Sequence, residues 1–491
     1  MRPRPSLAGR ALMAVGLMFG FYLLALGICA ALGMSLWFDA THGRVHPKLW
    51  LFSGGAILAI GTAIWPRRLT FDDPGVPLTE ANQPELWKLV REVASDAGQA
   101  PPAQLFLAED VNAFVTERDS RLGFGGKRVL GIGLPLMHVL TVPQLRAVLA
   151  HEFGHFYGGD TKLGPFLYRT RMAIGRTITK LKKKESKLSK PFEWYGKWFL
   201  RVTHSISREQ EYAADAVAVR LTGREPAASA LRRIGGVAAL FDHYLEDEMF
   251  PALNAGARPG LLDGFAGFLA APEMQEPQQR MAESAMQAKS DPYDTHPRLH
   301  ERLAAIAEVT EPGSMPAEGP LSTTLLRDLP QLETAVLVYM TGRPDIAQIP
   351  ATDWSAACAA AAVRPWREFA AEHGAKFAGL TIADYASQSG ALGELATRVD
   401  AEIPADRRDG AGAWMLTAML NQALLRAGFV VESSPGRPIA LVRGEERFEP
   451  RRLGGELREG KLVEADWRAR CERLGVADLP LVEPSTAKPG E

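Results

Sequence analysis

The stretch RAVLAHEFGHFYGGDT, residues 146–161, contains the pattern His-Glu-x-x-His. On a helix, residues four apart point the same way, so His151 and His155 would present two imidazole nitrogens to one point. Two such nitrogens can share a zinc ion at about 2.0–2.1 Å, and Glu152 lies beside them as a candidate general base. The pattern arises by chance in roughly one chain in a hundred of this kind. A buried helix with two hydrogen-bonded histidines is therefore the competing interpretation.

The sequence around this pattern predicts where its helix begins, and a second helix can be predicted downstream. Thr141 can cap a helix, and Gln144 follows three residues later, as in a capping box. A second helix is predicted in SISREQEYAADAVAVRLTG, residues 205–223, with Ser207 as its cap and Gly223 at its end. The two helices are the expected frame of the site.

A catalytic zinc ion needs a third protein ligand, with the fourth position left to water. The second helix places Glu211 and Asp215 four residues apart. We expect Glu211 to be the third ligand. We expect Asp215 to accept a hydrogen bond from the second ring nitrogen of a zinc-binding histidine, with His151 as the preferred candidate. The alternative is the charged face of a surface helix, but the Ala-rich surroundings predict burial, and buried carboxylates need partners.

Two uncharged runs near the N-terminus predict a transmembrane helix hairpin. Residues 11–38 are a run of 28 uncharged residues, and residues 49–66 are a second uncharged run. About 20 apolar residues are enough for a helix to cross a bilayer. A cleaved signal peptide is the alternative, but the first run is too long for one and a second follows at once. Arginines precede the first run and follow the second, so the positive-inside rule predicts that both ends lie in the cytoplasm.

A basic segment lies between the two predicted metal helices. Residues 160–210 contain 13 Lys and Arg against four acidic residues, and the aromatic run PFEWYGKWFL follows the most basic part. This composition suits an anionic cytoplasmic membrane surface, while a solvated basic loop is the competing interpretation.

Charge and cysteine content exclude some classes of protein. A net charge of −1 gives no indication of a nucleic-acid partner. The three scattered cysteines suggest no disulfide framework, which fits a reducing compartment. Zinc would therefore be held by His and carboxylate ligands, one ion per chain, without thiolates.

Four pieces of sequence in order resemble the membrane-bound zinc metallopeptidases that include bacterial HtpX and the type I CAAX prenyl endopeptidases. They are DVNAFV (110–115), LRAVLAHEFGH (145–155), SREQEYAADAVA (207–218) and DTHPRLHERL (294–303). The resemblance covers roughly residues 80–310. The resemblance implies a catalytic domain that faces the cytoplasm and cleaves membrane or membrane-associated proteins. Together with the two predicted spans, it places the expected protein in a bacterial inner membrane.

The chain also departs from this family. HtpX-like enzymes usually have two more apolar spans between the metal helices, whereas this segment is basic and only patchily apolar, so surface contact fits better than spanning. The prenyl endopeptidases enclose their site in a chamber of many membrane helices, which two spans cannot build. Cleavage of prenylated proteins is therefore not expected.

The predicted fold is α+β and mainly helical, in three parts. A transmembrane hairpin takes residues 1–70, a zincin-like metallopeptidase domain residues 71–310, and a mostly helical accessory region residues 311–491, which ends in a small strand-plus-helix module. Strands are predicted at AQLFLAED (103–110) and KRVLGIGLPL (127–136), with the polar FVTERDSRLGFGG (114–126) as a link.

Two further residues are assigned to the site. DVNAFVTE (110–117) is predicted as an edge strand beside the cleft to which a peptide substrate could add, with Asn112 as a side-chain contact; an ordinary buried strand is the alternative. His296 is predicted as the catalytic oxyanion donor because it precedes Pro297, a residue suited to the first helical position. Helix capping is the competing role, and Tyr293 and Arg302 are the next candidates.

These observations favour a membrane-anchored zinc endopeptidase with protein or peptide substrates. Two alternatives are a catalytically inactive scaffold of the same fold and a zinc hydrolase with a non-protein substrate. The first receives no support from the sequence, since the candidate base and ligands are all present.

Overall fold

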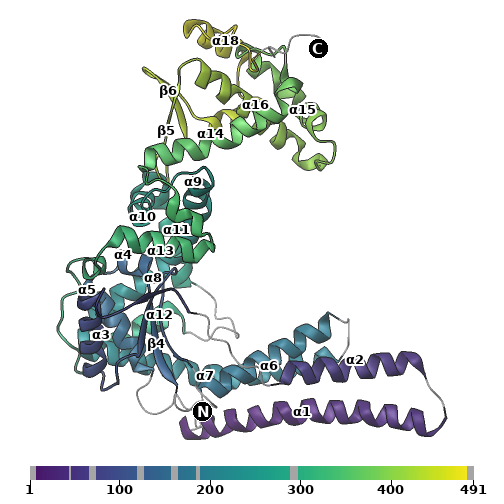
Figure 1. Cartoon of the computed structure of the whole chain (residues 1–491), viewed down its shortest axis with the longest axis vertical. Coiled ribbons are helices and arrows are strands. Elements are labelled where there is room, and N and C mark those ends of the chain that lie inside the picture. The colour runs from purple at the N-terminus through teal and green to yellow at the C-terminus, as the bar shows by residue number, and fades with distance from the viewer. Residues whose placement is uncertain are drawn as a thin grey trace. The chain divides into compact units, whose positions relative to one another are not determined.

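The structure is a computed structural model (Figure 1), and it describes residues 7–43, 46–65, 73–118, 126–155, 164–183, 188–287 and 297–483. The chain forms two compact units: residues 1–238 with 281–332, and residues 239–280 with 333–491. Helices dominate both, so the predicted mainly helical α+β fold is confirmed. The predicted domain boundaries stay a prediction.

Two long apolar helices open the first unit. α1 spans Leu7–Thr41 and α2 spans Pro47–Ile64, and both are long and apolar enough to cross a membrane. The turn between them is held by Asp39, whose carboxylate accepts hydrogen bonds from the backbone N–H of His46 at 2.9 Å and from the Trp50 indole at 3.0 Å. The predicted hairpin of two apolar helices is present.

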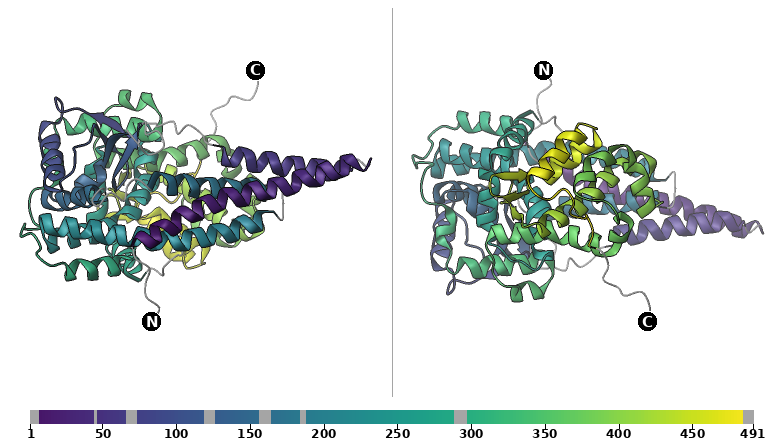
Figure 2. Two further views of the ribbon diagram at one scale, coloured as in Figure 1. Left: turned by 90° about the horizontal axis from the view of Figure 1, so that it is seen from below. Right: turned by 90° about the horizontal axis from the view of Figure 1, so that it is seen from above.

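Two more helices lie alongside this hairpin (Figures 1 and 2). α6 spans Gly164–Lys182 and α7 spans Ser189–Thr222. Phe192, Tyr195 and Phe199 of α7 are buried in one cluster with Leu17 and other residues of α1, α2 and α6. The basic segment between the metal helices therefore packs on the hairpin through its apolar side.

The cap predicted at Ser207 is wrong. α7 runs through this position without interruption, and the Ser207 hydroxyl donates to the carbonyl of Thr203, four residues back, at 3.3 Å. A serine inside a helix can satisfy its hydroxyl in this way, so it marks no boundary. The predicted end is right: α7 stops at Thr222, and Gly223 takes a φ of +120°.

A four-stranded sheet forms the other part of this unit. Its strands are β1 (Val76–Leu78), β2 (Gln104–Ala108), β3 (Ala113–Arg118) and β4 (Lys127–Gly133), in the order β1-β2-β4-β3. β2 and β4 are parallel, and among the described strands β3 pairs with β4 alone, antiparallel. β3 is thus an edge strand, as predicted from DVNAFVTE. The predicted polar link is wrong over residues 114–118, which are strand.

Helices surround the sheet and complete the unit. Their bounds are α3 Pro84–Asp96, α4 Leu134–Val139, α5 Val142–Gly154, α8 Arg224–Tyr244 and α12 Leu299–Glu308. The apolar side of α3, which includes Leu86, Val90 and Val93, is buried. The capping box predicted for α5 is present, since Thr141 and Gln144 each accept a hydrogen bond from the other's backbone N–H.

The second unit has its own core, built around α16, most of whose residues are buried. Its helices are α9 Phe250–Asn254, α10 Leu261–Ala270, α14 Trp354–His373, α15 Leu392–Val399, α16 Arg408–Arg426, α17 Pro450–Arg458 and α18 Glu464–Arg473. The second unit also contains the beginning of α11 (Gln275–Gln287) and most of α13 (Leu329–Thr341) up to its end. The strands β5 (Val430–Glu432), β6 (Ala440–Arg443) and β7 (Glu446–Phe448) form an antiparallel sheet. The predicted strand-plus-helix ending is confirmed.

Candidate metal centre

α5 and α7 meet closely at the site, and one glycine makes this possible. Gly154 ends α5 against Ala214 of α7, where a Cβ on Gly154 would lie 2.9 Å from the Ala214 Cα. Real Cβ atoms essentially never approach backbone so closely. The absence of a side chain at Gly154 therefore lets the histidines of α5 face the carboxylates of α7.

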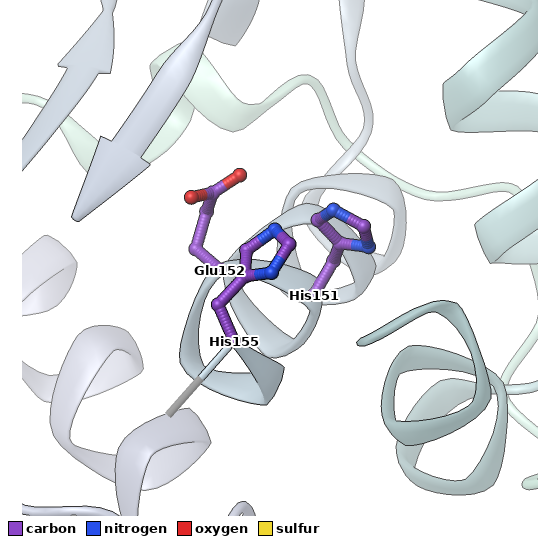
Figure 3. Close-up of side chains that lie close together, drawn as sticks. All are labelled: His151, Glu152 and His155. Atoms are coloured by element: carbon purple, nitrogen blue, oxygen red, sulfur yellow. The ribbon is translucent and has the colours of Figure 1, made fainter. Parts of the chain in front are cut away.

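The two imidazoles and the glutamate of the motif leave α5 toward one side (Figure 3). The ligand atoms of His151, Glu152 and His155 all lie within 4.8 Å of one another. The two rings are 4.7 Å apart at their centroids and nearly perpendicular, at 83°. This is the arrangement that the i, i+4 spacing predicts.

Glu211 stands opposite both rings. Its carboxylate oxygens lie 3.5 Å from Nε2 of His151 and 3.8 Å from Nε2 of His155, and its side chain is only 7% exposed. Two ligand atoms around a tetrahedral zinc ion, each at about 2.0–2.1 Å, are separated by roughly 3.3 Å. The three side chains therefore fit one small metal ion with little movement.

Asp215 lies one turn after Glu211 and contacts the other nitrogen of the first ring. Its Oδ1 is 2.9 Å from Nδ1 of His151, and its side chain is 4% exposed. The predicted contact between Asp215 and His151 is thus found. It fixes the orientation of the ring so that Nε2 faces Glu211, with Nη2 of Arg302 at 3.4 Å from the same nitrogen.

Arg302 of α12 enters the same cluster. Its guanidinium donates two hydrogen bonds to Asp215, at 2.6 and 2.9 Å, and its Nη1 lies 3.5 Å from Oε2 of Glu211. From the sequence, Arg302 is predicted only as an alternative to His296. The signal that places it is long-range: 87 residues separate it from Asp215, and no local pattern indicates that contact.

The electrostatic environment shifts two of these groups strongly. Burial raises the pKa of Glu152 to about 7, although the neighbouring charge of His151 and the backbone N–H of Val115 in β3 oppose the shift. For His151, burial alone would lower the pKa, but the hydrogen bonds to Asp215 and Glu211 raise it to about 9. The metal-free cluster therefore holds its first histidine protonated at neutral pH.

A cavity of about 310 Å³ opens over the cluster. The edge strand borders it with Asn112, Ala113 and Phe114. α8 supplies an apolar wall of Ala227, Ala230, Leu231 and Ile234. This apolar wall is not among the features predicted from the sequence.

Asn112 lines the cavity as expected, and its side-chain oxygen accepts a hydrogen bond from the N–H of Ala113 at 2.9 Å. His296 lies outside the described residues, so its predicted role stays a prediction. The first helical position predicted for Pro297 is wrong, because α12 begins at Leu299 and Pro297 precedes the helix. The N–H of Arg298 donates to the Glu301 carboxylate at 3.2 Å, which caps this start.

Comparison with known proteins agrees with this geometry. Residues 80–310 match peptidase family M48. The chain is 26% identical to the Protease HtpX homolog of Thiobacillus denitrificans over 52% of this chain and 82% of that protein. It is 24% identical to the homolog of Methylacidiphilum infernorum, over 59% of this chain and 95% of that protein. No solved structure matches the chain significantly.

The fold and the site thus define a membrane-associated metallopeptidase. The match of residues 80–310 and the similarity to the HtpX proteases support the HtpX/M48 family of metallopeptidases.

Proposed function

We propose that the chain is a zinc-dependent endopeptidase whose metal is held by His151, His155 and Glu211. The observation that carries this proposal is the buried carboxylate of Glu211 facing both imidazoles at 3.5 and 3.8 Å. Two neutral imidazoles and one carboxylate are a common ligand set of catalytic zinc, whereas calcium and magnesium prefer oxygen ligands.

Zinc, when bound, supplies a Lewis acid that lowers the pKa of water toward 7 and polarises the scissile carbonyl. Glu152 then acts as general base: it takes the proton of the attacking water and delivers it to the leaving amine. Its pKa of about 7 suits both directions of transfer near neutral pH. Asp215 and Arg302 touch neither substrate nor water in this scheme, and they hold His151 in orientation.

The substrates we propose are membrane or membrane-associated proteins. A peptide can add along the outer side of β3, with which no other described strand pairs. Backbone hydrogen bonds there bind it with little regard to side-chain identity. Asn112 would add a side-chain contact at this edge. His296 remains our candidate oxyanion donor.

We further propose that the catalytic domain faces the cytoplasm, at a bacterial inner membrane. The support is the distribution of charge, since arginines flank the two spans on the side of both chain ends.

The test is cleavage of casein, or of the chain itself, by the purified full-length protein with and without a chelator. Activity that is lost on chelation and restored by zinc supports the proposal. Glu152→Gln should keep its zinc and lose about 10²–10⁴-fold in turnover, because an amide cannot accept the proton. Glu85→Gln, an exposed change on α3, is the matched control.

Two other outcomes identify the competing functions. Zinc binding without cleavage of any protein would favour a scaffold that has kept the fold. Chelator-sensitive hydrolysis of small esters or amides alone would favour a non-protein substrate. Near wild-type turnover in Glu152→Gln would show that another base acts.

A further inference from the structure

One side of the first half of α7 is covered by neither α1 nor α6. Its exposed residues recur at helical spacing and alternate between cations and indoles. They are Lys190, Trp194, Lys197, Trp198 and Arg201, called the Lys-Trp stripe below, and Pro191 is exposed beside them. Trp194 is 67% and Trp198 44% exposed, and their rings stack at 6.1 Å. Apolar residues of the opposite side are buried against the hairpin.

The hairpin marks the level of the bilayer edge through its aromatic residues. Fifteen residues separate Tyr22 from Trp37 on α1, and fifteen separate Trp50 from Trp65 at the end of α2. Each interval corresponds to roughly 22 Å of helix. All four side chains are exposed, and Trp and Tyr gather at the two edges of the hydrocarbon layer. Tyr22 and Trp65 therefore mark the edge nearer the catalytic domain.

Direct contacts tie α6 and α7 to that edge. The hydroxyl of Tyr195 donates to the carbonyl of Leu17 at 2.6 Å. Arg176 donates to the carbonyl of Ala63 at 3.2 Å, and Lys180 donates to the Thr62 hydroxyl at 2.8 Å. Since Thr62 and Ala63 immediately precede the C-terminal end of α2, the Lys-Trp stripe is held near the level of Tyr22 and Trp65.

We propose that the Lys-Trp stripe is a docking surface for the headgroups of anionic phospholipids. Its three cations face outward and outnumber the one acidic residue among them, Glu193, which is half-buried and pairs with Lys182 at 3.3 Å. The surface is therefore complementary to phosphate. Its two indoles suit the interfacial layer.

The same charge argues against a second copy of the chain as the occupant. A twofold contact would bring the stripe against itself and oppose its three cations to three more. The proposal concerns membrane contact alone, so it stands or fails independently of peptidase activity.

The first test measures depth. The full chain, with Cys29→Ala to remove the partly exposed thiol, is spin-labelled at Trp194→Cys and placed in nanodiscs of mixed phosphatidylcholine and phosphatidylglycerol. The label should be relaxed by oxygen more than by a water-soluble nickel complex, as at Leu26→Cys of α1. A label at Lys88→Cys, an exposed position of α3, should show the reverse. A label at 194 that behaves like the one at 88 contradicts the proposal.

The second test measures lipid selectivity. Lys190→Gln, Lys197→Gln and Arg201→Gln together should reduce the phosphatidylglycerol retained by the detergent-extracted protein in native mass spectrometry several-fold. The control combines Lys88→Gln, Arg367→Gln and Arg407→Gln, which remove the same charge at other exposed positions. Equal retention by the two triple variants overturns the lipid assignment. Disulfide cross-linking between two chains through Trp194→Cys would instead identify a second copy as the occupant.

Discussion

At the scale of single residues, His151 couples metal binding to proton binding. Its pKa of about 9 arises because Asp215 and Glu211 stabilise the charged ring against burial. Zinc needs the neutral ring, so the metal must displace a proton at every pH below this value.

We therefore expect zinc affinity to fall as pH drops below 9, by roughly tenfold per pH unit for the one proton displaced. Competition with a zinc-sensitive dye across this range measures the slope. The metal-free fold should behave in the opposite way. Because the folded pKa is raised, protonated His151 stabilises that fold fully below 6.5, and this contribution is lost as pH rises through 9. A pH-independent affinity would show that His151 is not a ligand.

Asp215 should matter to the metal although we do not expect it to bind zinc. Asp215→Asn removes the charge that His151 and Arg302 both contact, and loss of such a supporting partner typically weakens metal binding by about 10–100-fold. Equilibrium dialysis with zinc measures the change. Asp242→Asn, at an exposed position, is the control and should bind zinc as the wild type does.

At the scale of elements, the approach of α5 to α7 depends on Gly154. A Cβ there would lie 2.9 Å from backbone, so Gly154→Ala must separate the two helices. We expect this change to lower the free energy of unfolding by about 1–3 kcal/mol and to weaken zinc binding. Gly175→Ala on α6 is the matched control, because nothing lies within 4 Å of the added methyl. It should stabilise by about 0.5–1 kcal/mol. Equal stability of the two variants, measured by denaturant unfolding, would contradict this account.

Elements differ in how far the sequence predicts them. The cap at Thr141, the edge strand of DVNAFVTE and the i, i+4 pairs are local patterns, and the structure shows each of them. The packing of α7 on α1 is not local: the bond from Tyr195 to Leu17 joins residues 178 apart. Hydrophobic pattern shows that Phe192 and Phe199 face inward, but it does not identify the helix they face. For the same reason, local sequence patterns do not predict the contact of Arg302 with Asp215.

At the scale of the whole molecule, the charge around the spans predicts which side of the membrane carries the catalytic domain. Protease added to intact cells should leave that domain whole, and the same protease should digest it once the cells are opened. Immunoblotting against a C-terminal tag measures both. Cleavage from the outside would reverse the proposed orientation.

The length of α7 sets a distance that any substrate must cover. One unbroken helix carries both the Lys-Trp stripe and Glu211, and the thirteen residues from Trp198 to Glu211 span roughly 20 Å. An extended chain leaving the bilayer needs about six residues to cover this distance. We therefore expect about six residues next to the bilayer to remain uncut in membrane-protein substrates, with cleavage beginning beyond them. The test is mass-spectrometric mapping of the cut sites in a substrate whose cytoplasmic tail is shortened stepwise. An uncut segment next to the bilayer supports the expectation, and cuts adjoining the bilayer would rule it out.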